Sequence, residues 1–458
     1  MQFFIYNSIT RRKELFKPIH KGKVSMYTCG PTVYDFSHIG NFRTFIFQDL
    51  LKRWLIHLGY NVKHIMNITD VDDKTIKKSM QSNLSLKTIT ENYTSEFMND
   101  IMWLKINPAD NYPKATDHIE DMIKMIETLI FNKMAYVGGD GSVYFDISSY
   151  KNYGKLSNII IKQSTKRNFR RLQDEYQVND PQDFALWKKR KLSDGNIFWN
   201  SPWGQGRPGW HIECSAMSIK LLGTHFDIHC GGVDNIFPHH ENEIAQSVGS
   251  TGEKFVNYWI HSEHLMVDGS KMSKSKSNFY TLNDLKEKGF CPQSIRFQLL
   301  SGHYRTKITF SLKKKHESDK IINRISNFYF DLKRFGADKM QGHHLPEAYE
   351  SFKSCLNNDL DTPGALAVFL KWMKEANKNI DSDLREKWNF MKVFDSVFKF
   401  IKQEPEKIET KVKGLLNDRE KARDRKDWKK ADQLRAKILE HGWIIEDTKD
   451  GQKLKKNA

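Results

Sequence analysis

The fold is decided by residues 24–68, which read VSMYTCGPTVYDFSHIGNFRTFIFQDLLKRWLIHLGYNVKHIMNI. The segments Val24–Cys29 and Asn61–Ile68 are predicted to be strands, and the apolar residues between them recur at helical spacing until Gly59. Two strands joined by a single helix lie parallel in one sheet. This stretch therefore predicts the first unit of a doubly wound, Rossmann-type α/β sheet.

The sheet is expected to be interrupted and then resumed. Residues 111–199 contain a predicted helix at Asp117–Asn132 and a short strand at Val143–Asp146, and we interpret them as an insertion. Strands are expected again at Phe226–His229 and Lys254–Ile260.

The connection between these two later strands is predicted from its glycine and proline residues. Gly231-Gly232 is expected to be a turn. Pro238 is expected to open a helix that continues to Gln246, because proline is favoured in the first helical turn.

The rest of the chain is predicted to be mainly helical. Residues 312–402 are charged and helical in pattern, a further helix is expected at Asp418–Glu440, and a short apolar run follows at Trp443–Ile445. The expected architecture is thus a Rossmann-type sheet domain with an insertion, then an α-helical bundle and a small C-terminal domain. The expected divisions are 1–110 and 200–260 for the two halves of the sheet domain, 111–199 for the insertion, 261–311 for a connecting region, 312–408 for the bundle and 409–458 for the last domain.

The charge of the chain favours a polyanionic partner. The sequence has 73 Lys+Arg and 56 Asp+Glu, a net charge of +17. Residues 411–458 alone hold 15 Lys+Arg and 9 Asp+Glu, which is +6. Lysine is abundant along the whole chain, so charge alone leaves open whether the partner is a nucleic acid.

The cysteines and the hydropathy pattern indicate the compartment. Five scattered cysteines argue against a disulfide framework and for a reducing environment. No run approaches the roughly 20 apolar residues that cross a bilayer, and no signal peptide is expected at the N-terminus. A cytoplasmic chain without a membrane partner is therefore expected.

Two short motifs favour binding of a nucleoside triphosphate. His38-Ile39-Gly40-Asn41 is expected between a strand and a helix, where helical N–H groups, a close glycine backbone and a histidine donor suit phosphate. Lys271-Met272-Ser273-Lys274-Ser275 lies in a stretch rich in Gly, Ser and Lys, and its two lysines could neutralise a leaving pyrophosphate. Taken alone, each motif also fits an ordinary turn or a solvated loop.

Four residues form a candidate set of metal ligands. His239 and Glu243 are four apart on the expected helix and so share one face. Cys29 ends the first strand, and Cys214 lies in the stretch Gly209–Met217 after the insertion. Two thiolates, one imidazole and one carboxylate suit tetrahedral zinc at the carboxyl edge of a parallel sheet. Singly, each residue is also consistent with core packing or a solvated helix face.

The order and spacing of the two motifs resemble the signature pair of class I aminoacyl-tRNA synthetases. Over nearly the whole chain, further segments are similar to the cysteinyl-tRNA synthetase family. These segments are Tyr27–Gly30, Asn67–Asp70, Ser201–Gly204, Gly206–Trp210, His225–His229 and His239–Glu243.

The resemblance implies a ligase that activates L-cysteine with ATP and magnesium and transfers it to tRNA(Cys). It implies that ATP is bound and activated by residues of the two motifs, namely His38, Gly40, Asn41, Lys271 and Lys274. It further implies one zinc ion per chain, held by Cys29, Cys214, His239 and Glu243. The zinc would select the thiol, because a pocket that reads shape alone separates cysteine from serine poorly, about 10²-fold.

The same resemblance implies a cysteine pocket and a mode of tRNA binding. Thr69, Trp210 and His229 match pocket residues, and Asp234 is a candidate for the amino group. The second motif lies in the region that faces the acceptor stem, the last domain binds the anticodon, and the family is typically monomeric.

The chain departs from the family pattern at several positions. Asn41 replaces a usual second histidine, Lys276-Ser277-Asn278 replaces Leu-Gly-Asn, and Cys230 replaces glycine. A tryptophan common near Gln452–Leu454 is missing, and Trp443 is expected to pack in a core rather than stack on a base.

Two other functions remain open from the sequence. A cysteine ligase of the same superfamily that acts on an amino sugar would share both motifs and the ligand set, but would lack an anticodon-binding end. A non-catalytic tRNA-binding paralogue would be expected to have lost the lysine motif or a zinc ligand.

Overall fold

The computed structural model describes residues 2–159, 170–171, 183–271, 278–402, 409–448 and 451–456. The contacts within the chain divide it into two compact units, Met1–Lys402 and Gln403–Ala458. The finer division of the first unit into a sheet domain, an insertion and a bundle stays a prediction.

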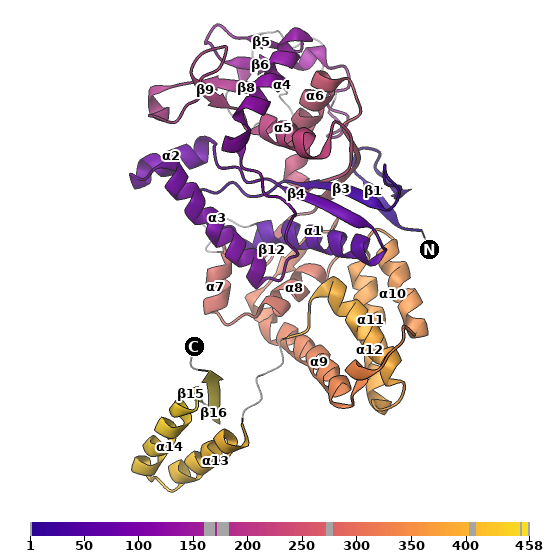
Figure 1. Ribbon diagram of the computed structural model, residues 1–458, viewed down its shortest axis with the longest axis vertical. Coiled ribbons are helices and arrows are strands. Elements are labelled where there is room, and N and C mark those ends of the chain that lie inside the picture. Colours follow the sequence, from indigo (N-terminus) through magenta and orange to yellow (C-terminus); the bar gives the residue numbers. More distant parts are fainter. Residues whose placement is uncertain are drawn as a thin grey trace. The chain divides into compact units, whose positions relative to one another are not determined.

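A parallel four-stranded sheet forms the centre of the first unit (Figure 1). Its strands are, in spatial order, β11 (Val256–Ser262), β10 (Phe226–Gly232), β3 (Lys23–Thr28) and β4 (Asn61–Met66). All neighbouring strands run parallel. The prediction of a Rossmann-type α/β sheet is confirmed.

Helices cover both faces of this sheet. Helix α1 (Ile39–His57) connects β3 to β4, and α6 (Glu241–Thr251) connects β10 to β11. Tyr258 and Ile260 of β11 belong to the same core as α1, whereas Trp259 between them belongs to the core of α5 (Trp210–Leu222) and α6. Strands covered on both faces are usually rich in apolar residues, whereas these strands also contain buried polar residues, among them His64, Asp227 and His229.

The turn expected at Gly231-Gly232 is wrong. Both glycines extend β10 and pair with His261 and Ser262 of β11. A Cβ atom on Gly231 would lie 2.6 Å from the ring of His240, so glycine is required here for a close side-chain approach. The turn signal of a Gly-Gly pair was thus overridden by tertiary packing.

A second sheet contains the strands of the predicted insertion, residues 111–199, with β5, β6, β8 and β7 following one another, and β9, which comes after residue 199, pairs with β8. These strands are β5 (Ala135–Val137), β6 (Val143–Phe145), β7 (Arg170–Arg171), β8 (Asp183–Lys189) and β9 (Gly206–Pro208). The predicted helix of this region is α4 (Ile119–Phe131), and α5 (Trp210–Leu222) returns the chain to the central sheet. Lys188 of β8 and Arg207 of β9 both form ion pairs with Asp73, so this second sheet is attached to the first residue of α2 (Asp73–Ser82).

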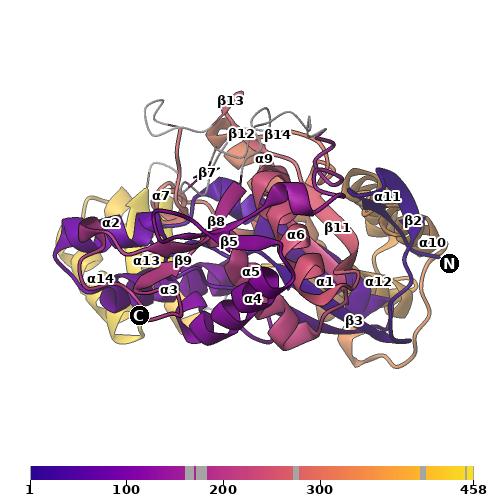
Figure 2. The same ribbon diagram turned by 90° about the horizontal axis from the view of Figure 1, so that it is seen from above.

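Other elements complete the first unit around the sheet. The hairpin of β1 (Phe4–Asn7) and β2 (Arg12–Leu15) lies beside β11, and Ser8 N donates to Trp259 O at 2.8 Å. After β4, the chain continues in α2 (Asp73–Ser82) and α3 (Leu86–Trp103). A small sheet of β12 (Leu265–Val267), β13 (Ser270–Lys271) and β14 (Ile308–Phe310) follows the central sheet (Figure 2).

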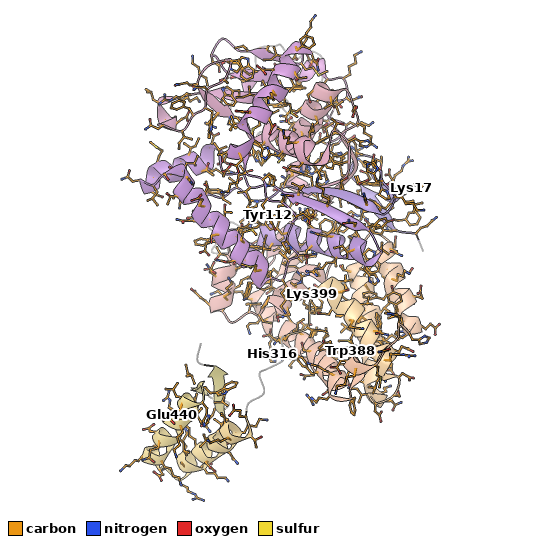
Figure 3. All side chains as sticks on the ribbon, in the orientation of Figure 1. Lys17, Tyr112, His316, Trp388, Lys399 and Glu440 are labelled. Atoms are coloured by element: carbon orange, nitrogen blue, oxygen red, sulfur yellow. The ribbon has the colours of Figure 1, made fainter. Side chains whose placement is uncertain are left out.

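The predicted bundle consists of helices that share an aromatic core. They are preceded by α7 (Leu282–Glu287) and α8 (Pro292–Leu300), and comprise α9 (Lys315–Arg334), α10 (Glu347–Asn357), α11 (Thr362–Ala376) and α12 (Leu384–Phe398). Trp388 of α12, labelled in Figure 3, stacks on Tyr329 of α9 with ring centroids 4.7 Å apart. Within the described residues, no helix has the length and apolar character to cross a bilayer.

The second unit contains two helices and a hairpin. Its elements are α13 (Thr410–Asp424), α14 (Trp428–Glu440), β15 (Trp443–Thr448) and β16 (Gly451–Lys456). The single helix expected at Asp418–Glu440 is wrong, because the chain breaks at Lys426, which has a φ of +60°. Asp427 then caps α14 by accepting from Lys430 N at 3.1 Å. Trp443 packs against the small core of Val412, Ile438 and Ile445, as expected.

A buried histidine of the central sheet predicts a loss of stability in acid. His64 of β4 is 3% exposed and its Nε2 lies 2.9 Å from Thr28 Oγ1. Burial, followed by the charge of Lys52, lowers the pKa of His64 to about 3. The folded state therefore disfavours protonation, and its stability falls as the pH drops from the unfolded pKa of about 6.5 towards 3.

Between pH 7.5 and pH 5.0, this group is expected to reduce the free energy of unfolding by about 2 kcal/mol. Urea unfolding of wild type and His64→Gln at both pH values measures the effect, since the variant removes the titrating ring. An equal pH dependence in the two proteins would contradict the assignment.

Candidate active site

A cavity of about 790 Å³ lies at the carboxyl edge of the central sheet. Parallel α/β sheets bind their ligands at this edge, where strand ends and helix starts converge. The wall includes Cys29 after β3, His38 and Asn41 at the start of α1, Trp210 at the start of α5, and Asp234 after β10.

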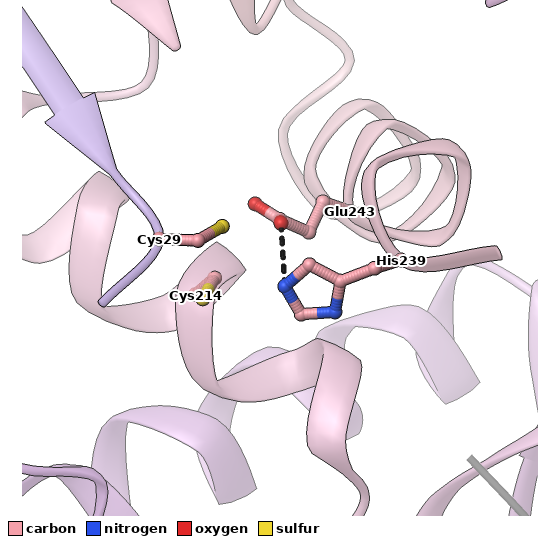
Figure 4. A group of neighbouring side chains, drawn as sticks. All are labelled: Cys29, Cys214, His239 and Glu243. Carbon is pink, nitrogen blue, oxygen red and sulfur yellow. Dashed lines mark ion pairs between the residues drawn. The ribbon is translucent and has the colours of Figure 1, made fainter. Parts of the chain in front are cut away.

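Four potential metal ligands meet beside this cavity (Figure 4). Cys29 follows β3, Cys214 lies on α5, His239 lies in the short helical turn before α6, and Glu243 lies in the first turn of α6. Their ligand atoms all lie within 4.8 Å of one another. His239 Nε2 is 3.0 Å from Glu243 Oε1, which is the contact expected for residues four apart on one helical face.

The cluster is buried and strongly coupled. Burial opposes ionisation of Glu243, but the neighbouring His229 and His239 outweigh it and lower the pKa of Glu243. For His239, burial acts against the charged form, yet Glu243 and Cys214 raise its pKa. A hydrogen bond with Cys29, together with burial, raises the pKa of the Cys214 thiol well above its ordinary value. A metal ion bound here must therefore displace protons from the thiols, since thiolates are the ligands.

Histidines surround the four ligands on their buried side. His229 Nε2 lies 2.9 Å from Glu243 Oε2, and His211 Nδ1 lies 3.0 Å from His239 Nδ1. His240 contacts the Cys29 thiol at 3.2 Å. Contacts of this kind orient metal-ligating side chains and select their tautomers. Cys29, His229, His240 and Glu243 also form a second overlapping group of possible ligands.

The histidine contacts continue away from the cavity. The second ring nitrogen of His240 lies 2.8 Å from His261 Nε2, and His261 Nδ1 lies 2.7 Å from Ser8 Oγ. Sequence reasoning missed His211, His240 and His261. His211 lies three residues before Cys214 and His240 directly follows His239, so their closeness to candidate ligands was a usable signal, whereas His261 comes from a strand with no local signal.

Of the residues expected to form the cysteine pocket, two line the cavity and two are buried away from its wall. Trp210 lines the cavity and stacks on His239, with ring centroids 4.2 Å apart and planes 26° apart. Asp234 also lines the cavity, and His229 is buried against Glu243. Thr69 is buried at 2% exposure and accepts from Asn67 Nδ2 at 3.1 Å, and it is not one of the described residues that line the cavity.

The structure describes the whole of the first motif, but only the backbone of Lys271 from the second. His38, Gly40 and Asn41 line the cavity at the N-terminus of α1. Lys271 ends β13, but its side chain and the whole of Lys274 lie outside the described residues.

The sheet, the cavity at its carboxyl edge and the motif at the start of α1 are those of a class I aminoacyl-tRNA synthetase. The model of the class I (C) tRNA synthetase catalytic domain matches residues 15–320. An Agrobacterium radiobacter K84 LeuRS in complex with tRNA has a TM-score of 0.61 at 10% identity, covering 84% of this chain and 85% of that chain. Mycobacterium tuberculosis methionyl-tRNA synthetase bound by methionyl-adenylate has 0.58 at 13% identity, covering 82% and 92%. At such low identities the likeness concerns the fold.

More specific matches identify the family. The DALR domain matches residues 351–402, and the cysteinyl-tRNA ligase anticodon binding domain matches residues 407–453. The cysteine–tRNA ligase of Brachyspira hyodysenteriae is 46% identical, covering 98% of each chain. That of Chlamydia caviae is 45% identical, covering 99% of this chain and 98% of its own. The chain belongs to the cysteine–tRNA ligase family, and it is therefore a ligase.

The four-ligand group predicts binding of one divalent transition metal per chain. Cobalt(II) is expected to bind and to give thiolate-to-metal charge-transfer absorption, because two of the ligands are sulfur atoms. Cys214→Ser is expected to reduce affinity and to weaken this absorption. Cys230→Ser provides the matched control, since Cys230 lies outside both candidate ligand groups. A metal signal that depends on Cys230 but not on Cys214 would contradict this assignment.

Proposed function

We propose that this chain activates L-cysteine with ATP, transfers the cysteinyl group to tRNA(Cys), and uses one zinc ion to select the thiol. The proposed zinc ligands are Cys29, Cys214, His239 and Glu243. The observation that carries the proposal is the meeting of these four ligands beside the cavity at the start of α1, in a chain of the cysteine–tRNA ligase family.

The chemistry of the four ligands fits zinc. Sulfur, nitrogen and oxygen ligands in a buried group of four suit tetrahedral coordination. The 3.0 Å contact between the Nδ1 atoms of His211 and His239 holds the His239 ring with Nε2 towards Glu243. When bound, zinc supplies a preference for a thiolate over a neutral hydroxyl, which distinguishes cysteine from serine.

The proposed pocket for cysteine surrounds this group. Trp210 forms an apolar wall that also fixes the His239 ring by stacking. Asp234 lies in the cavity as a carboxylate for the substrate amino group. His229 supports Glu243 at 2.9 Å. Thr69 supports the wall from behind, because its backbone pairs with Thr32, which lines the cavity.

Activation is proposed to occur at the start of α1. The cysteine carboxylate attacks the α-phosphate of ATP, a bond to the carboxylate oxygen forms, and pyrophosphate leaves. His38, Gly40 and Asn41 present a donor, a close backbone and an amide to the phosphates, and the N-terminus of α1 favours their negative charge. Lys271 and Lys274 are proposed to neutralise the leaving pyrophosphate, with magnesium held largely by the phosphates.

Binding of tRNA is proposed to use several parts of the chain. Residues 409–458 would read the anticodon, 312–408 would connect them to the sheet domain, and 111–199 with 261–311 would receive the acceptor stem. The net charge of +17 supports a polyanionic partner. All five cysteines lie within the described residues as unpaired thiols, which supports a reducing, cytoplasmic compartment. We propose a monomer as the working form.

The competing functions are less well supported. An amino-sugar acceptor does not account for a matched anticodon binding domain over residues 407–453. A non-catalytic paralogue does not account for a complete group of four metal ligands.

Charging of tRNA(Cys) tests the proposal directly. Cysteine is expected to be esterified to tRNA(Cys), serine is expected to be rejected by more than the roughly 10²-fold of a shape-only pocket, and a zinc chelator is expected to abolish charging. The measurement uses labelled amino acid with and without chelator, with zinc added back as the control. Cysteine-dependent pyrophosphate exchange without charging would favour the amino-sugar ligase, and the absence of both reactions in zinc-loaded protein would favour the adaptor.

Removal of the second unit is expected to separate the two half-reactions. Deletion of residues 403–458 leaves the first compact unit intact, so cysteine-dependent pyrophosphate exchange is expected to persist near the full-length rate. Charging of tRNA(Cys) is expected to lose about 100-fold in kcat/KM, equal to about 2.7 kcal/mol. Both rates are measured on the full-length and shortened proteins, and an equal loss in both would contradict an anticodon role.

A further inference from the structure

The segment that follows the lysine motif is fixed against the first motif. Ile39 N donates to Tyr280 O at 2.9 Å, and His38 and Thr281 form an antiparallel β-bridge. Asn278 Nδ2 donates to Ser270 Oγ at 2.9 Å, so this segment is also attached to β13. The N-terminus of α1 is therefore held by residues about 240 positions later in the chain.

The His38 ring is held from two sides. On one side, the N–H group of Asn41 donates to His38 Nδ1 at 3.2 Å, while Asn41 Oδ1 accepts from His38 N at 3.1 Å. This reciprocal capping box is built into the helix start. On the other side, the Phe279 ring meets the His38 ring edge to face, with centroids 4.9 Å apart and planes 73° apart. Both rings line the cavity.

These two contacts determine the tautomer and the direction of the ring. Because Nδ1 accepts a hydrogen bond, a neutral His38 ring carries its proton on Nε2. Nε2 is then the hydrogen-bond donor, which is the form needed to stabilise charge on a phosphate oxygen. The cap alone leaves the ring able to turn about its χ angles, whereas an aromatic neighbour in edge-to-face contact restricts it.

We propose that Phe279 is a positioning residue that holds the His38 ring on its helix cap, so that Nε2–H faces the ATP side of the cavity. Phe279 itself takes no part in the chemistry. This inference rests on the proposed function, in which His38 donates to the phosphates during activation. Phe279 lies four residues after the lysine motif, so its contact with His38 connects the first motif to the segment that follows the second.

Phe279 is suited to this role by its place in the fold. It is half-buried and lines the cavity, whereas its neighbour Tyr280 contacts the main core and holds α1 through a backbone carbonyl. Loss of the Phe279 ring therefore removes a contact with His38 while the backbone contact at Tyr280 persists. Tyr280→Leu is the matched control, because it makes a similar change one residue away from the ring contact.

Kinetics of pyrophosphate exchange give the first test. Phe279→Leu is expected to lower kcat by about 10-fold to 100-fold, because small misplacement of a transition-state donor is costly. KM for cysteine is expected to stay unchanged, since the metal ligands are untouched. Phe279→Tyr keeps the ring and is expected to retain near wild-type kcat, and so is Tyr280→Leu.

Nitrogen NMR of histidine-labelled protein gives a second test that does not depend on activity. The His38 signals, assigned by their loss in His38→Asn, are expected to show a protonated Nε2 and an unprotonated, hydrogen-bonded Nδ1. In Phe279→Leu they are expected to become a mixture of tautomers, and in Phe279→Tyr and Tyr280→Leu they are expected to match wild type. Phe279→Met replaces the leucine variant if circular dichroism shows that the latter does not fold.

The possible outcomes distinguish the positioning role of Phe279 from the proposed function of the chain. A leucine variant with unchanged kcat, or with reduced kcat but an unchanged His38 tautomer, overturns the positioning role of Phe279. Wild-type protein without cysteine-dependent exchange contradicts the proposed function, while the NMR comparison still decides whether Phe279 holds the ring.

Discussion

The buried carboxylate of Glu243 is the constraint around which the site is built. A carboxylate without solvent is costly unless it is paired and hydrogen-bonded. Glu243 is fully buried, and its two oxygens face His239 and His229, which come from two different elements of the fold. The end of β10 and the start of α6 must therefore meet at one point, and the parallel sheet makes this possible because its strand ends share one edge.

Around Glu243 and its two histidine partners, further side chains are joined by short contacts. Cys29 and Cys214 complete the ligand group, and His211 and His240 contact His239 and Cys29 from behind. A site of this kind is rigid because each side chain is held by another, so a bound ion and a substrate thiol would meet a prepared geometry. With zinc in the proposed site, selection of cysteine would depend on sulfur chemistry as well as on cavity shape.

The part of the cavity at the start of α1 is suited to a different kind of ligand. The start of α1 offers backbone N–H groups and a capped histidine, and these suit phosphate rather than metal. The two halves are joined by the β3–α1 connection, which begins at Cys29 and ends at His38. One loop thus runs from a candidate metal ligand to a motif residue at the start of α1, and both residues line the same cavity.

The sequence by itself determined the parallel βαβ start, because that depends on local periodicity. It also determined the family and predicted the four candidate ligands, because short motifs of specific residues can be recognised wherever they lie in the chain. It did not reveal that Gly231-Gly232 continues β10, since only the approach of the His240 ring shows why glycine is needed there. Nor did it reveal the break at Lys426 or the contact of Phe279 with His38. The tertiary structure decided these features, because side-chain packing between distant segments can override local turn and helix preferences and leaves no periodic pattern in the sequence.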